Sequence, residues 1–126
     1  MRANHSPGFT LIELLVVLSI IALLLSIAVP RYLGSIDKSK EVVLKENLAL
    51  LRDSIDKYYG DQGKYPEVLG DLVSKKYLRR IPADPITESP TTWVVVPPED
   101  KEKGGVFDVR SGSTERARNG SPFGEW

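Results

Sequence analysis

The chain contains no cysteine and only one histidine among its 126 residues. Without cysteine it has no disulfide framework, whatever compartment it occupies. The histidine is His5, so residues 6–126 contain neither imidazole nor thiolate. This excludes Ser-His-Asp and Cys-His nucleophilic sites there, and it excludes zinc sites built on those ligands.

The chain also lacks a net charge, because 17 Lys and Arg residues balance 17 Asp and Glu residues. No overall field therefore draws the protein toward nucleic acid or anionic lipid. The length allows one small domain and no deep catalytic cleft. Chemistry that uses carboxylates alone survives these exclusions, and it would still need a cleft and shifted pKa values.

What the sequence has instead is a long apolar run at residues 9–29. Its polar residues are Thr10, Glu13, Ser19 and Ser26. As a helix the run would be roughly 32 Å long, close to the ~30 Å hydrocarbon core of a bilayer. Leu, Ile and Val occupy every side of it, so it predicts a single membrane-spanning helix that faces lipid.

Two ordinary explanations of this run compete with a functional one. Ser26-Ile27-Ala28 has the small-x-small pattern of a cleavage site, which would make the run a secretory signal peptide. The run is longer than the usual signal core, however, and a carboxylate inside it is penalised in lipid. The other explanation is a plain signal anchor in which Glu13 is incidental. Because a charge inside a membrane segment is usually functional, Glu13 is a candidate site residue.

Residues 8–30, GFTLIELLVVLSIIALLLSIAVP, resemble the N-terminus of type IV prepilins and type II secretion pseudopilins. The resemblance implies that a prepilin peptidase cleaves between Gly8 and Phe9, that residues 1–8 are a leader, and that the new Phe9 amine is methylated. It also implies that Glu13 pairs with the Phe9 amine of a neighbouring subunit. In an apolar medium such a pair is favoured over two separate charges, so the pair would drive and align assembly.

Pro30 marks either a helix end or a bend, because it lacks a backbone donor and clashes with the carbonyl of Ser26. The resemblance implies a helix that continues, with a weak point at Pro30. The next segment supports continuation, since apolar residues recur there at three- and four-residue steps: Leu44, Leu48, Leu51, Ile55, Tyr58 and Tyr59. Gly60 and Gly63 are expected to end this helix.

We therefore divide the chain into a leader (1–8), a transmembrane and polymerisation helix (9–30), and a head (31–126) that includes the second half of the long helix. In the head, residues 67–78 predict a short helix, and residues 91–96 and 106–110 predict a hairpin over the apolar stripe. The tail, residues 111–126, is expected to be an ordered loop whose last residue, Trp126, docks. The predicted class is α+β, with a long helix packed on a small antiparallel sheet, as in pilins.

The segments YYGDQGKYP, YLRRIPADP and GGVFDVRSGS resemble the head of the major, G-type pseudopilin. Type IV pilins usually carry two cysteines in the C-terminal loop, so their absence favours a pseudopilin. G-type heads often bind calcium in this loop, which makes Asp108 and Glu125 candidate ligands. Calcium takes six to eight oxygens, usually with several carboxylates, and we predict no metal site or cofactor. Alternatively, Asp108 caps a turn or pairs with Arg116 or Arg118.

A second candidate patch is KKYLRR, at residues 75–80. These cations could contact DNA phosphates, as in some minor pilins of uptake systems. More often, cations gather at a helix end because they complement its dipole. The main interpretation therefore includes no nucleic acid.

The resemblance implies a structural subunit and not an enzyme. The subunit would belong to a type II secretion pseudopilus, a helical filament assembled from the bacterial inner membrane to drive protein secretion. The protein would cross that membrane once, with its head in the periplasm. Its partners would be further copies of itself, the prepilin peptidase, minor pseudopilins and the assembly platform. The alternatives are a type IV pilin of a surface pilus and a DNA-binding minor pilin of a competence system.

Overall fold

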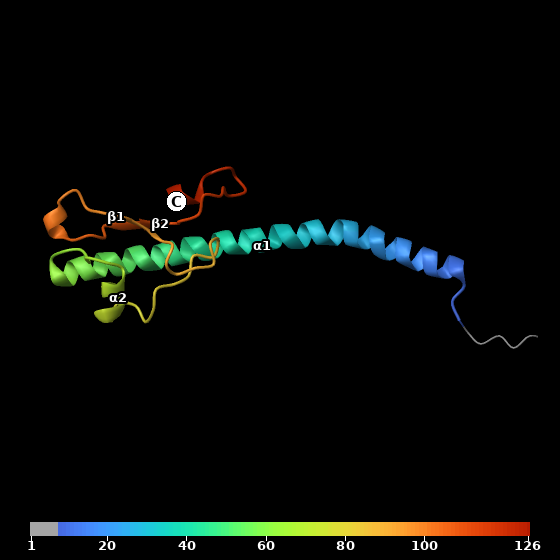
Figure 1. Ribbon diagram of the computed structural model, residues 1–126, viewed down its shortest axis with the longest axis horizontal. Helices are drawn as coiled ribbons and strands as arrows, with labels where there is room; N and C mark the ends of the chain where they lie inside the picture. Colours follow the sequence, from blue (N-terminus) through green and yellow to red (C-terminus); the bar gives the residue numbers. More distant parts are fainter. Residues whose placement is uncertain (1–7) are drawn as a thin grey trace, which may run out of the picture. The chain divides into compact units, whose positions relative to one another are not determined.

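The computed structural model describes residues 8–126, whose elements are shown in Figure 1. In chain order they are the helices α1 (Leu11–Gln62) and α2 (Gly70–Ser74), the strand β1 (Val94–Val96), the 3-10 helix η1 (Lys101–Lys103), the strand β2 (Asp108–Arg110) and the 3-10 helix η2 (Phe123–Glu125). These elements confirm the predicted α+β class. The chain divides into two compact units, with the boundary between Ile36 and Asp37.

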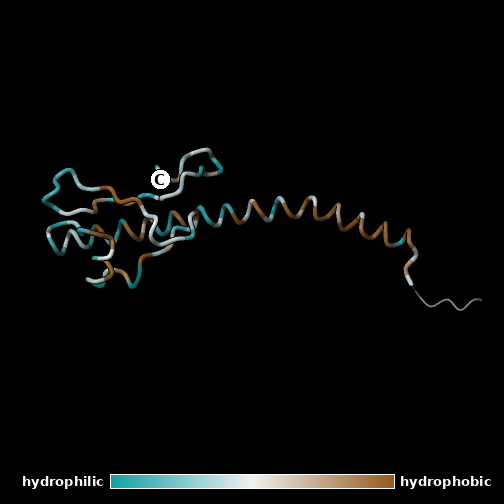
Figure 2. The backbone as a smooth tube through the Cα atoms, viewed as in Figure 1, coloured by the Kyte–Doolittle hydropathy of each residue, from teal (hydrophilic) through white to brown (hydrophobic). Residues whose placement is uncertain are grey.

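The first unit contains the apolar half of α1. Its Leu, Ile and Val side chains are exposed on every side of the helix, and Figure 2 shows the hydrophobic character of this stretch. By length and composition, α1 is the one helix among the described residues that could cross a membrane. Pro30 lies inside α1, so the helix continues through it as predicted. The proposed weak point at Pro30 stays a prediction.

The C-terminal end of α1 lies at Gln62, between the two glycines that were expected to end the helix. Gly60 is still helical, so the prediction that it ends the helix was wrong. Gly63 follows the last helical residue with φ at +72°, and its N–H donates to the carbonyl of Tyr59 at 2.9 Å. A left-handed residue after a helix is most often glycine because it has no Cβ, so Gly63 ends α1 as predicted.

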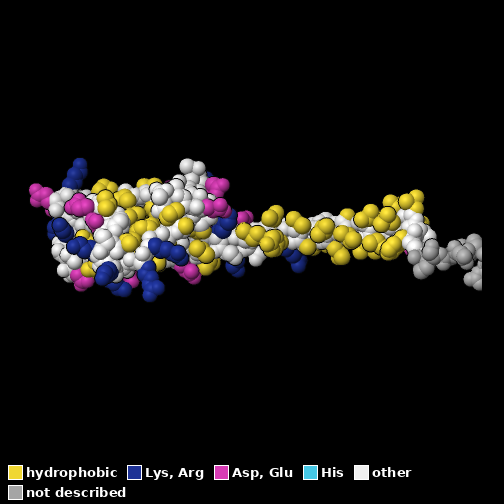
Figure 3. Space-filling model, turned by 60° about the horizontal axis from the view of Figure 1, so that its bottom comes forward, with side chains coloured by type: hydrophobic (Ala, Val, Ile, Leu, Met, Phe, Trp, Pro, Cys, Tyr) yellow, Lys and Arg dark blue, Asp and Glu magenta, His cyan; other side chains and the backbone are white. Residues whose placement is uncertain are grey.

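The core of the second unit is built on one stripe of α1. Five of the six residues predicted for this stripe are buried: Leu44, Leu48, Leu51, Ile55 and Tyr58. The sixth, Tyr59, is partly exposed and stacks on Tyr65 with ring centroids 4.4 Å apart. The stripe belongs to one buried cluster with Leu72, Leu78, Trp93, Val106, Val109, Ala117 and Phe123. Figure 3 shows charged side chains gathered on the outside of this unit.

The two strands pair antiparallel, with Val94 opposite Arg110 and Val96 opposite Asp108. They are shorter than the predicted strands. The N–H of Phe107 still donates to the carbonyl of Val96 at 2.8 Å, but residues farther from the paired positions bond elsewhere. The N–H of Val106 donates to the carbonyl of Pro66 at 2.8 Å. On the other strand, the N–H of Thr91 donates to the hydroxyl of Ser89 at 3.2 Å.

Helix α2 is much shorter than the predicted helix at residues 67–78, and two local features set its ends. Before it, the carboxylate of Asp71 accepts the backbone N–H groups of Glu67 and Val68, which holds these residues in a turn. After it, Lys76 adopts φ of +65°, and the N–H of Tyr77 donates to the carbonyl of Leu72 at 2.8 Å. That pattern ends a helix in a Schellman motif. The exposed cations of residues 75–80 therefore lie at and beyond the end of α2.

A buried carboxylate links the loop before β1 to the residue after β2. Asp84 is fully buried, accepts the N–H of Ile86 at 2.8 Å and accepts the hydroxyl of Ser111 at 2.5 Å. The neighbouring carbonyl of Pro82 accepts the indole N–H of Trp93 at 2.8 Å. These bonds fix the position at which the C-terminal segment, residues 111–126, leaves the sheet.

Candidate functional site

The predicted cleavage site lies just before α1 in non-helical backbone. Gly8 and Phe9 are both exposed, Phe9 to 80%. A peptidase needs an accessible bond in non-helical backbone, and these residues offer one. The rest of the predicted leader, residues 1–7, lies outside the described residues.

Thr10 and Glu13 form a reciprocal pair of hydrogen bonds at the start of α1. The backbone N–H of Glu13 donates to the hydroxyl of Thr10 at 3.1 Å, and the N–H of Thr10 donates to the carboxylate of Glu13 at 3.3 Å. Since α1 begins at Leu11, Thr10 occupies the N-cap position and Glu13 the third helical position. This arrangement is a capping box, which satisfies two backbone donors that a helix start otherwise leaves open.

The capping box changes the physical description of Glu13. Its carboxylate accepts a backbone N–H and lies at the positive end of the helix dipole, so it is not an isolated charge. The spacing Thr-x-x-Glu before an apolar run is the sequence signature of this motif, and the sequence interpretation missed it. The proposed pairing of Glu13 with the Phe9 amine of another subunit stays a prediction, because one chain cannot show a contact between two.

The carboxylate of Asp108, a candidate calcium ligand, is already paired with a cationic side chain of the same protein. Its carboxylate accepts the Nε–H of Arg52 at 2.8 Å and the N–H of Val109 at 2.8 Å. The alternative that paired Asp108 with Arg116 or Arg118 was wrong. Arg116 instead donates to the carbonyl of Gly120 at 2.8 Å.

The residues present do not fit a calcium site. Glu125 is exposed in η2, and the carboxylate of Asp108 is already neutralised by Arg52. Among residues 8–126, no group of three or more His, Cys, Asp or Glu side chains is placed to hold a metal ion. Calcium sites in proteins collect six to eight oxygens, usually from several carboxylates, and this loop does not gather them.

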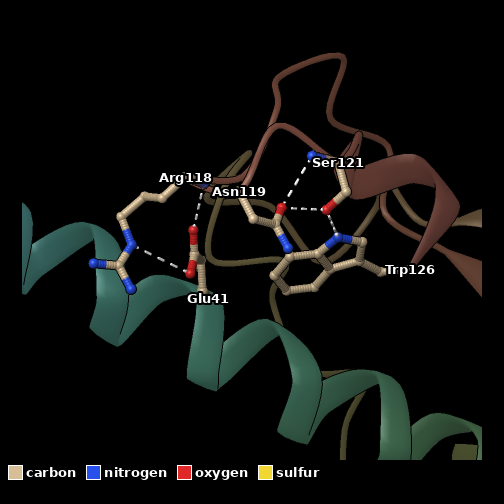
Figure 4. Close-up of polar contacts among 5 residues, drawn as sticks. All are labelled: Glu41, Arg118, Asn119, Ser121 and Trp126. Atoms are coloured by element: carbon tan, nitrogen blue, oxygen red, sulfur yellow. Dashed lines mark hydrogen bonds and ion pairs between the residues drawn. The ribbon is translucent and has the colours of Figure 1, made fainter.

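Arg118 in the C-terminal segment forms two bonds to Glu41 on α1. Its backbone N–H donates to one carboxylate oxygen at 2.9 Å, and its Nε–H donates to the other at 3.4 Å (Figure 4). The backbone hydrogen bond from Arg118 is the main cause that holds the pKa of Glu41 below its ordinary value. The charge of Arg118 acts in the same direction, while desolvation of the carboxylate opposes it. Glu41 therefore stays ionised as a fixed anchor for the segment.

Trp126 docks as predicted. Its indole N–H donates to the hydroxyl of Ser121 at 2.9 Å, and that hydroxyl donates to the side-chain oxygen of Asn119 at 2.6 Å (Figure 4). The ring meets the buried Phe123 edge to face, with centroids 5.0 Å apart. The ammonium of Lys45 lies 4.9 Å from the centroid of the indole ring, within the range of a cation–π contact.

A groove of about 600 Å³ lies between α1 and the C-terminal segment in the second unit. Its charged lining contains carboxylates and cations in equal number: Asp37, Glu41, Glu115, Lys40, Arg116 and Arg118. Two of these, Glu41 and Arg118, are bonded to each other. The groove therefore has no dominant sign of charge with which to attract an ionic ligand.

The start of the chain matches a known family model. Residues 4–29 match the model described as the prokaryotic N-terminal methylation motif. This match includes Gly8, Phe9 and Glu13. It supports the resemblance on which their predicted roles rest.

Curated relatives match much more of the chain, and each is named type II secretion system core protein G. The protein from Klebsiella michiganensis is 32% identical over 101 residues, which cover 68% of this chain and 71% of the relative. The protein from Escherichia coli K12 is 30% identical over 128 residues, covering 88% and 84%. The protein from Vibrio cholerae is 29% identical over 141 residues, covering 99% and 94%. No solved structure gives a significant match. With its methylation motif, its long apolar helix and these relatives, the chain belongs to the type II secretion system core protein G family.

Proposed function

We propose that this protein is a structural subunit of a type II secretion pseudopilus, assembled from the inner membrane to drive protein secretion. The observation that carries the proposal is the apolar half of α1. Its side chains are exposed over residues 9–29, with one carboxylate near the start. An apolar surface of this extent is unstable in water, so lipid or other apolar helices must cover it.

This apolar surface faces lipid before assembly and other copies of the same helix in the filament. Because lipid tails are as apolar as leucine, moving the helix from one to the other gives little hydrophobic gain. Assembly therefore needs a specific attraction. Glu13 is the only ionisable side chain in residues 9–29, so a bond from it to the Phe9 amine of a neighbour supplies both attraction and register.

This role requires processing between Gly8 and Phe9. Cleavage by a prepilin peptidase removes the leader, residues 1–8, and creates the amine that is methylated and that Glu13 binds. The helix of residues 9–30 then holds the subunit in the inner membrane, with the head of residues 31–126 in the periplasm. Pro30 gives the helix a weak point at the end of the apolar half. Minor pseudopilins and the assembly platform are the further partners.

The subunit acts by assembly rather than by catalysis. Two features of the described head support this: the chain there has no histidine or cysteine, and the groove between α1 and the C-terminal segment mixes charges that partly satisfy one another. The names of the relatives favour a secretion pseudopilus over a surface pilus or a competence pilus.

The experiment is to express variants of Glu13 together with the assembly machinery and to measure sheared or crosslinked filament. Glu13→Leu should insert and be cleaved at Gly8 but should form no filament. Glu13→Gln should be intermediate at best, because an amide keeps the shape and loses the charge that attracts an ammonium. Glu99→Gln, at an exposed carboxylate in the head, is the matched control and should give the parental yield. A parental yield from Glu13→Leu would contradict the proposed pairing.

A further inference from the structure

Three acceptor oxygens converge on the side chain of Arg52. Its Nε–H donates to the carboxylate of Asp108 at 2.8 Å, and its Nη2 donates to the carbonyl of Val109 at 3.0 Å. The same Nη2 donates to the backbone oxygen of Trp126 at 2.9 Å. One carboxylate and two backbone oxygens are the kind of oxygen ligands that bind a cation. Here the cation that they bind is the guanidinium of Arg52.

Arg52 is held in place for this role by the helix that carries it. Its neighbour Leu51 and Ile55 one turn later are both fully buried in the core of the second unit. The side chain itself is 35% exposed, and its partner Asp108 is 26% exposed. A planar guanidinium presents several donors in a fixed fork, so it can satisfy acceptors from β2 and from Trp126 at once. Lysine, with a compact ammonium, cannot reproduce this geometry.

A second pair ties the same C-terminal segment to α1 with the polarity reversed. Here the carboxylate is on α1, at Glu41, and the cation is on the segment, at Arg118. The ring of Trp126 is covered by the ammonium of Lys45, which also belongs to α1. The segment is therefore attached to α1 at two positions, Arg118 and Trp126, by charged groups of the chain.

We infer that the C-terminal segment is closed by these resident cations and needs no calcium ion. Arg52 supplies positive charge at the point where β2 and Trp126 meet, and its presence repels a divalent cation from the same oxygens. This departs from the calcium-bound loop that the G-type resemblance implies. The head then keeps its shape whatever the calcium concentration around it.

The first test measures thermal unfolding of the full chain in detergent micelles, followed by tryptophan fluorescence. For the parent, the unfolding midpoint should be the same with a calcium chelator and with millimolar calcium. Arg52→Lys should lower the midpoint by several degrees in both conditions, because it loses the forked contacts. Lys57→Gln is the matched control, since Lys57 lies on α1 in an exposed ion pair with Asp53, and it should leave the midpoint nearly unchanged.

The second test uses hydrogen exchange with mass spectrometry on residues 117–126 of the same samples. Exchange of this segment should speed up in Arg52→Lys and should not respond to calcium in the parent. A calcium-dependent rise of several degrees, or slower exchange of the parental segment in calcium, would overturn the inference. So would an Arg52→Lys variant that behaves like Lys57→Gln in both measurements.

Discussion

Thr10 and Glu13 cap each other, because the backbone N–H of each donates to the side chain of the other. The residue proposed to hold two subunits together thus already has a partner within its own chain. A free carboxylate in lipid would be costly, whereas this one accepts a hydrogen bond at a helix start. The proposed contact with a neighbouring amine therefore adds to an existing arrangement and does not replace an isolated charge.

The capping box predicts that Thr10→Val loosens the first turn of α1. Valine keeps the size of the side chain but removes the oxygen that accepts the N–H of Glu13. Loss of an N-cap oxygen costs about 1 kcal/mol, which corresponds to roughly fivefold faster exchange of the Glu13 amide. NMR of the chain in micelles measures this rate. Thr10→Ser keeps the oxygen and should exchange at the parental rate, and equal rates for all three proteins would rule out the box.

The proposed processing predicts a mature chain that begins with N-methyl-phenylalanine at Phe9. Mass spectrometry of protein extracted from membranes measures the new N-terminus directly. Gly8→Ala should be cleaved, at the parental rate or more slowly. Gly8→Leu should not be cleaved, because a bulky side chain then occupies the position before the cut bond. Glu13→Leu should still be cleaved, since it leaves the cut bond intact. A mature chain starting at Val29 would instead identify a signal peptide.

The bond from Arg118 predicts a pH dependence of the stability that Glu41 contributes. The folded-state pKa of Glu41 is lowered from 4.5, mainly by the backbone hydrogen bond from Arg118. A depressed folded-state pKa gives a contribution that is complete above the unfolded pKa and is lost as pH falls through the folded one. The difference in unfolding midpoint between the parent and Glu41→Gln should therefore be constant from about pH 7 to pH 5 and shrink at lower pH.

The control for this measurement is Glu46→Gln, a change at an exposed carboxylate on the same helix. Its midpoint should stay close to the parental value at every pH. If the difference for Glu41→Gln instead grows on acidification, the carboxylate is not held in its ionised form by Arg118.

The docked tail predicts very different effects for its two aromatic residues. Phe123 is only 5% exposed, so Phe123→Ala should destabilise the head by roughly 3–5 kcal/mol through loss of buried surface and creation of a cavity. Trp126→Phe keeps the edge-to-face contact and loses the hydrogen bond to Ser121, which should cost about 1 kcal/mol. Chemical denaturation of the full chain in micelles measures both. Deletion of residues 120–126 should be at least as damaging as Phe123→Ala, and an unchanged midpoint would contradict docking.

The long helix and most of its buried stripe could be predicted because both are local properties of the sequence. The repeat of Leu44, Leu48, Leu51 and Ile55 reports which side of a helix is buried, whatever covers it. The continuation of the helix through Pro30 could not be predicted from that residue alone, because a proline is compatible with a helix end and with a bend.

The details of the site depended on contacts that spacing does not encode. Arg52 and Asp108 are separated by 56 positions in the sequence, so no local pattern pairs them. Helix α2 was predicted, but too long, because it ends in a Schellman motif with Lys76 at positive φ, a position that glycine usually marks. The capping box of Thr10 and Glu13 is different, since its Thr-x-x-Glu spacing is local and could have been predicted from the sequence.

The bond from Arg52 to Trp126 also has a consequence for the order of folding. It joins residues 74 positions apart, so a large loop loses its conformational entropy before this contact stabilises anything. The contact therefore forms late, after α1 and the sheet have met. The same arginine therefore closes the head only after the rest of the head has folded.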